Sequence, residues 1–140
     1  MILAKDIMLD EIIVIYDDMR IRQVAHLMLR DRVSGFPVVS RDMGIVGIIT
    51  ITDLFRIITN ACAEKPDKEF HKRIAHCRDM AVADVMSRQV IAIRPETTLD
   101  EIIDIVQHQH VHTFPVVDGK KLVGIIGRHD ILNAIFSYDD

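Results

Sequence analysis

The sequence predicts a mixed α/β (α+β) protein in which two β-α-β-β-α repeats fold as one compact, pseudo-symmetric body. First, 22 Ile and 14 Val among 140 residues supply the β-branched aliphatic side chains that favour strands. Second, Phe36-Pro37-Val38-Val39 recurs as Phe114-Pro115-Val116-Val117, which indicates an internal duplication. Third, a unit of about 55 residues buries too little apolar surface to be stable alone, so we expect the two copies to pack together.

Other segments follow the same duplication. Asp6-Ile7-Met8 recurs as Asp84-Val85-Met86 at an offset of 78 residues, and Gly47-Ile48-Ile49 recurs as Gly124-Ile125-Ile126 at an offset of 77. The difference of one residue falls in a predicted turn, where a change of length disturbs no core contact. We therefore expect one repeat at residues 1–60, a partly helical linker at residues 61–81 and a second repeat at residues 82–140.

Each repeat is expected to open with a short strand, because Ile12–Ile15 and Val90–Ile93 are β-branched runs. A helix follows, because apolar residues recur at the i, i+3, i+4, i+7 spacing of a helix face. Those residues are Ile21, Val24, Ala25 and Met28 in the first repeat and Leu99, Ile102, Ile103 and Val106 in the second. The second helix has a capping box beginning at Thr98, whereas the first has Arg20 there and lacks this device.

Two strands joined by a turn come next, and a final helix closes each repeat. The strands are predicted at Phe36–Val39 with Ile45–Thr50 and at Phe114–Val117 with Leu122–Ile126; the final helices run from Thr52 to about Thr59 and from His129 to about Phe136. In the linker, Phe70, Ile74 and Cys77 share one face of a predicted helix. Its charged residues indicate a solvated face: Glu64, Lys65, Asp67, Lys68, Glu69, Lys72, Arg73, Arg78 and Asp79.

The junction between the second hairpin strand and the final helix is the sharpest local signal in the first repeat. A helix N-terminus offers unpaired N–H groups and a partial positive charge, so it favours an anion. Thr50 and Thr52 could add hydroxyl hydrogen bonds to a phosphate, and Asp53 could accept from both hydroxyls of a ribose. Thr50 and Asp53 also have the spacing of a capping box, so plain helix capping stays open.

The second repeat retains the acid at this junction as Asp130, but Gly127 and His129 replace the two threonines. Because Gly127 has no side chain with which to cap the helix, we interpret the retained acid as a ligand group rather than as a cap. Arg128 and His129 could supply positive charge for a phosphate in place of hydroxyls.

These motifs resemble a tandem pair of cystathionine β-synthase (CBS) domains, the Bateman module. The likeness covers almost the whole chain outside the linker, and the segment from Gly47 to Leu54 is similar to nucleotide-binding repeats of the AMP-activated protein kinase gamma subunit. The resemblance implies two repeats packed sheet to sheet around a pseudo-two-fold axis, with two clefts that draw on both copies. It also implies a homodimer of CBS pairs, with the apolar final helices as one possible contact.

The resemblance implies a regulatory, ligand-sensing module that binds AMP, ADP, ATP or a related adenosyl ligand in those clefts, with no required cofactor. Its implied contacts are Asp53 and Asp130 for the ribose, Ile48 and Ile125 for adenine, and Ser34, Thr50, Thr52, His112, Arg128 and His129 for the phosphates. Because Gly127 and His129 depart from the Thr/Ser pattern, we rank the Asp53 cleft ahead of the Asp130 cleft.

Two other functions stay open from the residues alone. His108, His110 and His112 would converge on one side of a strand and could bind a transition metal there, but they would not converge on a helix. His71, His76 and Cys77 add further metal-ligand types in the linker. A CBS pair that binds nothing and acts as a dimerisation scaffold is the other alternative.

Composition and motif content exclude several classes. A net charge of −4 without a basic run argues against a nucleic-acid or anionic-membrane binder, and Ile45–Ile51 is far shorter than the roughly 20 apolar residues of a membrane helix. Without a nucleophile elbow, P-loop or H-E-x-x-H motif, we expect no enzyme. Cys62 and Cys77 form no disulfide framework, so we expect a cytoplasmic protein whose output passes through a separate effector or through self-association.

Overall fold

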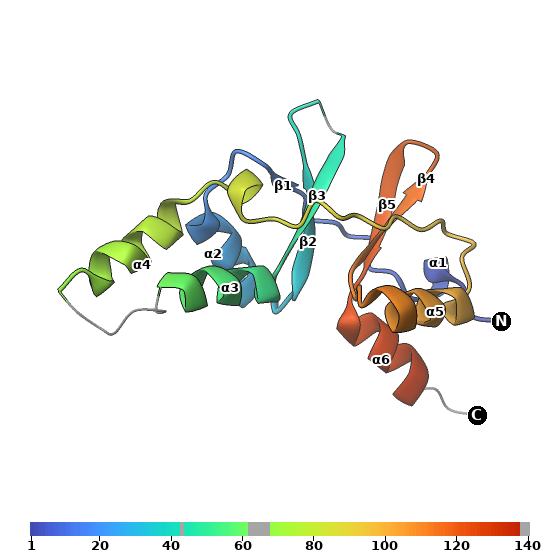
Figure 1. Ribbon diagram of the computed structural model, residues 1–140. Helices are drawn as coiled ribbons and strands as arrows, with labels where there is room; N and C mark the ends of the chain where they lie inside the picture. The colour runs from blue at the N-terminus through green and yellow to red at the C-terminus, as the bar shows by residue number, and fades with distance from the viewer. Residues whose placement is uncertain (43, 62–67, 138–140) are drawn as a thin grey trace. The chain divides into compact units, whose positions relative to one another are not determined.

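The computed structural model describes residues 1–42, 44–61 and 68–137 and shows the mixed α/β fold that the sequence predicts (Figure 1). The chain divides into two compact units that do not coincide with the sequence repeats. Unit 1 combines Met1–Ile13 with Val90–Asp140, and unit 2 is Val14–Gln89. Each sequence repeat therefore contributes its opening segment to the unit that holds the rest of the other repeat.

Unit 2 contains a three-stranded sheet of order β1-β2-β3, in which β1 runs parallel and β3 antiparallel to β2. Its elements are β1 (Ile15–Tyr16), α2 (Ile21–Asp31), β2 (Gly35–Val39), β3 (Ile45–Thr50), α3 (Ile51–Ala61), α4 (Phe70–Asp79) and the 3₁₀ turn η1 (Val82–Asp84). The helices α2, α3 and α4 contact one another (Figure 1). The linker residues Cys62, Glu64, Lys65 and Asp67 lie outside the described part of the chain.

Unit 1 contains the antiparallel hairpin of β4 and β5, and its helices α1 and α6 contact each other. Its elements are α1 (Ala4–Ile7), α5 (Leu99–Gln109), β4 (Phe114–Asp118), β5 (Lys121–Ile126) and α6 (Arg128–Phe136). Its core is aliphatic apart from one aromatic ring and consists of Ala4, Ile93, Ile102, Phe114, Val116, Ile126 and Ile131. The predicted hairpins and final helices are confirmed in both units.

The predicted opening strands are wrong in extent. Only Ile15 of the predicted Ile12–Ile15 lies in β1 (Ile15–Tyr16), and Val90–Ile93 is reduced to a single bridge between Ile93 and Val116. Ile93 donates its N–H to Pro115 O at 3.0 Å and accepts from Val117 N at 2.8 Å, which is the start of a parallel ladder. The next bond back along this ladder would need an N–H from Pro115, and proline has none, so the pairing stops.

The exchanged opening segments are held by equivalent backbone hydrogen bonds in the two units. In unit 1, Ala4 N donates to Thr97 O at 2.7 Å; in unit 2, Val82 N donates to Met19 O at 2.9 Å. Both side chains are fully buried. Further along, Leu9 forms an antiparallel bridge with Ile125. The equivalent bridge in unit 2 joins Ser87 to Ile48.

Two motif glycines make room for the methionines of these exchanged segments. A Cβ on Gly47 would lie 2.6 Å from Met86 Sδ and 2.8 Å from Ser87 O, and a Cβ on Gly124 would lie 2.8 Å from Met8 Cγ. The Asp-x-Met and Gly-Ile-Ile motifs are therefore packing partners, each with the copy from the other repeat. Glycine in a strand often marks a position that another segment of the protein approaches closely.

The expectation that the first long helix lacks a capping box is half right. Arg20 has no acceptor with which to cap the helix, but Gln23 Oε1 accepts the Arg20 N–H at 2.9 Å and so forms the return half of the box. Thr98 and Glu101 form both halves at the start of α5. Within the described residues, no helix has the length and apolar character to cross a membrane.

Candidate ligand sites at the strand-to-helix junctions

In unit 2, β3 passes directly into α3, and Asp53 lies in the first turn of that helix. The Asp53 side chain is almost fully buried, and its Oδ2 accepts hydrogen bonds from Thr50 N at 2.8 Å and from Thr50 Oγ1 at 3.2 Å. Asp53 N in turn lies 3.4 Å from Thr50 Oγ1. The capping box left open by the sequence is therefore present, and the Thr50 hydroxyl takes part in it.

The second carboxylate oxygen of Asp53 forms an ion pair that the sequence analysis missed. Arg56 Nη2 lies 2.9 Å from Asp53 Oδ1, while the Arg56 side chain is 56% exposed and that of Asp53 only 3%. The i, i+3 spacing of the two residues was the available signal, because residues three apart are neighbours on a helix. The pair neutralises a carboxylate that has been removed from water.

In unit 1, Asp130 occupies the equivalent position in the first turn of α6. Its Oδ2 accepts the Gly127 N–H at 2.8 Å, the same distance as the Asp53–Thr50 backbone bond. This corrects the argument that a glycine at the cap leaves the acid without a capping role. Half of a capping box needs only the backbone N–H of the cap residue, which glycine supplies.

Burial raises the pKa of Asp130, and the Gly127 N–H and the nearby His129 offset this effect only in part. The side chain is half-buried rather than enclosed. At neutral pH it is thus a partly desolvated carboxylate beside a helix N-terminus, a position where additional hydrogen-bond donors would stabilise it.

The other predicted contacts fall at the same two junctions. Ser34 is half-buried and accepts the Ile51 N–H at 2.9 Å through its carbonyl, so it adjoins the start of α3. Thr52 is exposed in the first turn of α3. Ile48 and Ile125 are 4% and 6% exposed, and both are held by the bridges to the exchanged segments. Each of these residues therefore adjoins a junction or the strand that leads to it.

Three of the residues predicted to contact phosphate in unit 1 have basic side chains. Arg128 and His129 are exposed in the first turn of α6, and His112 is half-buried in the loop before β4. Burial lowers the pKa of His112, and the nearby Arg128 and His110 lower it further. The positive charge of Arg128 therefore adds to burial in disfavouring the charged form of the His112 imidazole.

The three alternating histidines do not share a strand face. His108 is on α5, His110 is the left-handed residue that ends this helix (φ 56°), and His112 follows in the loop. His108 Nδ1 faces Asp104, with its backbone oxygen at 2.9 Å. Among the described residues, no three His, Cys, Asp or Glu side chains are grouped as a metal would require.

The CBS domain family matches residues 4–60 and 82–137, which include both junctions. The chain belongs to the CBS domain family. The match occurs twice along the chain, so the protein is a tandem CBS pair, as the sequence motifs predict.

Relatives of this CBS pair include an uncharacterized protein, MJ1426, of Methanocaldococcus jannaschii, which is 30% identical over 95% of this chain and 90% of its own length. The chain also matches a homoserine O-acetyltransferase of Methanohalobium evestigatum at 24% identity, over 94% of this chain. It spans only 24% of that protein, so the acetyltransferase name describes a much larger molecule.

Solved structures similar to this CBS pair include complexes with adenosyl ligands. CBSX2 in complex with AMP has a TM-score of 0.73 at 23% identity, covering 98% of both chains. The CBS pair of MJ0100, in complex with 5′-methylthioadenosine and S-adenosyl-L-methionine, has a TM-score of 0.74 at 23% identity, covering 96% of both chains. At these identities the likeness establishes the fold of this chain.

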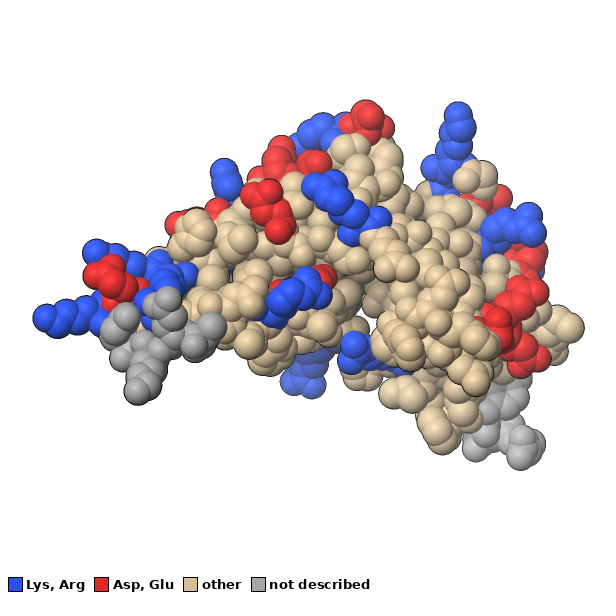
Figure 2. All heavy atoms as spheres, viewed as in Figure 1, with Lys and Arg blue, Asp and Glu red and all other residues tan. Residues whose placement is uncertain are grey.

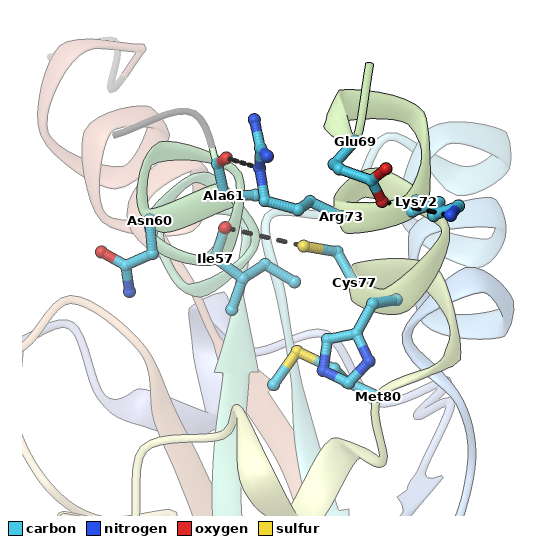
Figure 3. Close-up of a pocket in the computed structure, with 9 residues that line it drawn as sticks. Ile57, Asn60, Ala61, Glu69, Lys72, Arg73, Cys77 and Met80 are labelled. Carbon is cyan, nitrogen blue, oxygen red and sulfur yellow. Dashed lines mark hydrogen bonds and ion pairs between the residues drawn. The ribbon is translucent and has the colours of Figure 1, made fainter. Parts of the chain in front are cut away.

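A separate pocket of about 410 Å³ lies between α3 and α4 of the CBS pair, within unit 2 (Figure 3). Arg73 Nε donates to Ala61 O at 2.8 Å, and Cys77 Sγ lies 3.7 Å from Ile57 O, so both side chains join the two helices. The residues that line it are Ile57, Asn60, Ala61, Glu69, Lys72, Arg73, His76, Cys77 and Met80. This lining includes none of the residues predicted to bind nucleotide.

Proposed function

We propose that this CBS pair is a regulatory module that senses AMP, ADP, ATP or a related adenosyl ligand. The observation that carries the proposal is the pair of acids, Asp53 and Asp130, held at equivalent positions in the first turns of α3 and α6. The solved CBS pairs with AMP and with 5′-methylthioadenosine and S-adenosyl-L-methionine support it, because every one of those ligands contains an adenosyl group.

In this proposal, Asp53 and Asp130 accept hydrogen bonds from the ribose hydroxyls, since a carboxylate has lone pairs beyond those used in capping. Ile48 and Ile125 contact the adenine. The phosphates lie near the helix N-termini, whose unpaired N–H groups and partial positive charge favour anions. Their further contacts are Ser34, Thr50 and Thr52 at one junction and His112, Arg128 and His129 at the other.

The ligand would act by population shift. A nucleotide that binds one arrangement of the chain more tightly than another moves the equilibrium toward that arrangement, and a partner protein can respond to the change. No other cofactor is needed for this function, and the proposed output is regulation of an effector rather than catalysis. A cytoplasmic location, as expected from the sequence, would give access to adenosine nucleotides.

A calorimetric titration tests the proposal. AMP, ADP, ATP, S-adenosylmethionine and cyclic di-AMP are added in turn to the wild-type chain and to the double variant Asp53→Asn, Asp130→Asn. Asparagine keeps an acceptor for each cap, so the helices should persist. We expect at least one ligand to bind the wild type and to bind the double variant much more weakly. If none of the five binds, or if the double variant binds equally well, the sensor function fails and the ligand-free scaffold is favoured.

We also propose that the chain forms a homodimer through the apolar faces of α3 and α6. Both helices expose large apolar side chains, and the surface over α6 is mostly uncharged in the face shown in Figure 2. These side chains are Ile51, Phe55 and Ile58 on α3 and Leu132, Ile135 and Phe136 on α6. Two positions match between the repeats, Phe55 with Leu132 and Ile58 with Ile135, so each helix offers apolar surface that a second copy could cover. Light scattering of the wild type and of the double variant Phe55→Lys, Phe136→Lys tests the proposed homodimer. We expect a dimeric wild type and a monomeric variant, and a monomeric wild type would contradict the proposal.

A further inference from the structure

The two junctions differ at the position three residues after the acid. In α3 this position is Arg56, which pairs with Asp53 at 2.9 Å. In α6 the equivalent residue is Asn133, which carries no charge. Within the described part of the chain, Asp130 forms one hydrogen bond, to the Gly127 N–H, and no ion pair. The duplication has therefore produced one carboxylate that pairs with an arginine and one that, among the described residues, forms no ion pair.

The Asp53 carboxylate is closely satisfied by its own helix. Its Oδ2 accepts from Thr50 N and Thr50 Oγ1, and its Oδ1 pairs with Arg56. A ribose that approached Oδ1 would have to displace the guanidinium or share the oxygen with it. Charge-assisted hydrogen bonds are stronger than bonds to neutral hydroxyls, so this exchange would lose interaction energy.

The Asp130 carboxylate is in the opposite situation. It is half-buried, and among the described residues its one hydrogen bond goes to Oδ2 and leaves Oδ1 without a hydrogen-bond partner. Its pKa is raised because burial destabilises the charged form by more than the Gly127 N–H and His129 stabilise it. Two ribose hydroxyls would satisfy such a group without displacing any partner.

We infer that Arg56 competes with the ligand for Asp53, so that an adenosyl ligand fills the Asp130 junction at a lower concentration than the Asp53 junction. The inference rests on the proposed function and reverses the ranking that the threonine pattern suggested. It makes Arg56 a specificity-determining residue: the same fold would offer one high-affinity and one low-affinity position, and so respond to ligand over a wider concentration range.

A reciprocal exchange of the two residues tests this inference. Arg56→Asn removes the competitor at the first junction, and Asn133→Arg introduces a guanidinium at the same i, i+3 spacing at the second. Each change is made in a background with one working junction: Arg56→Asn with Asp130→Asn, and Asn133→Arg with Asp53→Asn. AMP and adenosine are both titrated, because adenosine has no phosphate that could attract the guanidinium.

We expect Arg56→Asn to tighten, and Asn133→Arg to weaken, the binding of both ligands by about 1.5-fold to fivefold, the range for a partly exposed ion pair. The control is Arg41→Asn, which removes an exposed arginine from an ion pair with Asp18 at the turn end of the β2–β3 hairpin. It should leave both affinities unchanged, which separates local competition from a general effect of net charge.

Two results would overturn the inference while leaving the proposed function intact. One is ligand binding that depends on Asp53 and Asp130 but is changed neither by Arg56→Asn nor by Asn133→Arg. The other is weaker AMP binding and unchanged adenosine binding after Arg56→Asn, which would assign Arg56 to the phosphate. If neither ligand binds in either background or in the wild type, the inference fails; the proposed function fails as well only if ADP, ATP, S-adenosylmethionine and cyclic di-AMP also do not bind the wild type.

Discussion

Asp130 has a helix-capping bond and a raised pKa at the same time, so its ionised form is held in a place where it is less stable than in water. Catalytic and binding sites commonly contain such groups, because the ligand later supplies what the folded chain does not. Asp53 is more deeply buried, accepts an additional hydrogen bond from the Thr50 hydroxyl and pairs with Arg56. The contrast between them is the most informative single-residue feature of this chain.

The raised pKa of Asp130 predicts a pH-dependent effect of Asp130→Asn on stability. The folded state holds this proton to a higher pH than the unfolded chain, so the stabilising contribution of Asp130 is present near pH 3.8 and is lost as the pH rises through the raised pKa. Asparagine does not titrate. In urea unfolding, the free energy of unfolding of Asp130→Asn relative to that of the wild type should therefore be higher at neutral pH than near pH 3.8. A difference that is constant, or that grows toward acid, would contradict this assignment.

Arg128 is expected to contribute to the lowered pKa of His112. Burial is the larger cause of the lowered pKa of His112 and Arg128 the next, so Arg128→Gln should raise this pKa while leaving it below 6.5. NMR of the imidazole carbon-bound protons against pH measures it directly. Lys121→Gln is the matched control, because Lys121 begins β5 and Arg128 follows its far end. A pKa that stays the same or falls in Arg128→Gln would show that the arginine does not act on His112.

In β3 and β5, Gly47 and Gly124 each leave space for a methionine side chain from an exchanged segment. The atoms that an added Cβ would approach differ between the two positions. At Gly47 one nearby atom is a backbone oxygen, Ser87 O, whereas at Gly124 the nearby atoms all belong to the Met8 side chain. A flexible side chain can move aside more easily than a backbone carbonyl.

Gly47→Ala should therefore destabilise the protein by about 1–3 kcal/mol, the usual cost of overpacking a core. Gly124→Ala should cost less, because Met8 can change rotamer. Chemical denaturation of both variants and the wild type provides the comparison. Equal costs, or a larger cost at Gly124, would show that the contact with Ser87 O is not the limiting one.

The sequence was sufficient to predict most of these elements, because hydrophobic periodicity and the duplication reinforce each other. It overestimated the opening strand at Val90–Ile93, since the limit is set by a proline on the partner strand, Pro115. It also treated Gly127 as evidence against capping, although the cap uses a backbone N–H. Arg56 was visible in the sequence at helical spacing, but only the folded helix shows that it reaches Asp53.

For the whole molecule, the exchanged segments are the feature that sequence could not supply, because a repeat pattern does not say which copy a segment packs against. We propose that residues 1–60 and 82–140 are the two duplicated repeats, joined by residues 61–81. The compact units nevertheless have other boundaries: unit 1 combines Met1–Ile13 with Val90–Asp140, and unit 2 is Val14–Gln89. Stability of each unit therefore depends on residues from both repeats.

Hydrogen exchange can detect this dependence in the intact chain. Ala4→Ser places a hydroxyl in the core of unit 1, at a cost of about 1–3 kcal/mol, and should speed exchange mainly in α5, β4 and β5. Val82→Ala leaves a cavity in unit 2 and should speed exchange mainly in α2, β2 and β3. If Ala4→Ser instead speeds hydrogen exchange mainly in the rest of its own sequence repeat, the assignment of Met1–Ile13 to unit 1 is wrong.

The measurement that tests the central claim most directly is methyl NMR of the isoleucines during titration with AMP. The two junctions predict the largest shifts at Ile48 and Ile125, and loss of these shifts in Asp53→Asn, Asp130→Asn. Ile57 is the internal reference, because it lines the pocket between α3 and α4 rather than a junction. Shifts at Ile48 and Ile125 that vanish in the double variant are the predicted result. Shifts confined to Ile57, or no shift at saturating AMP, would contradict a nucleotide site at the junctions.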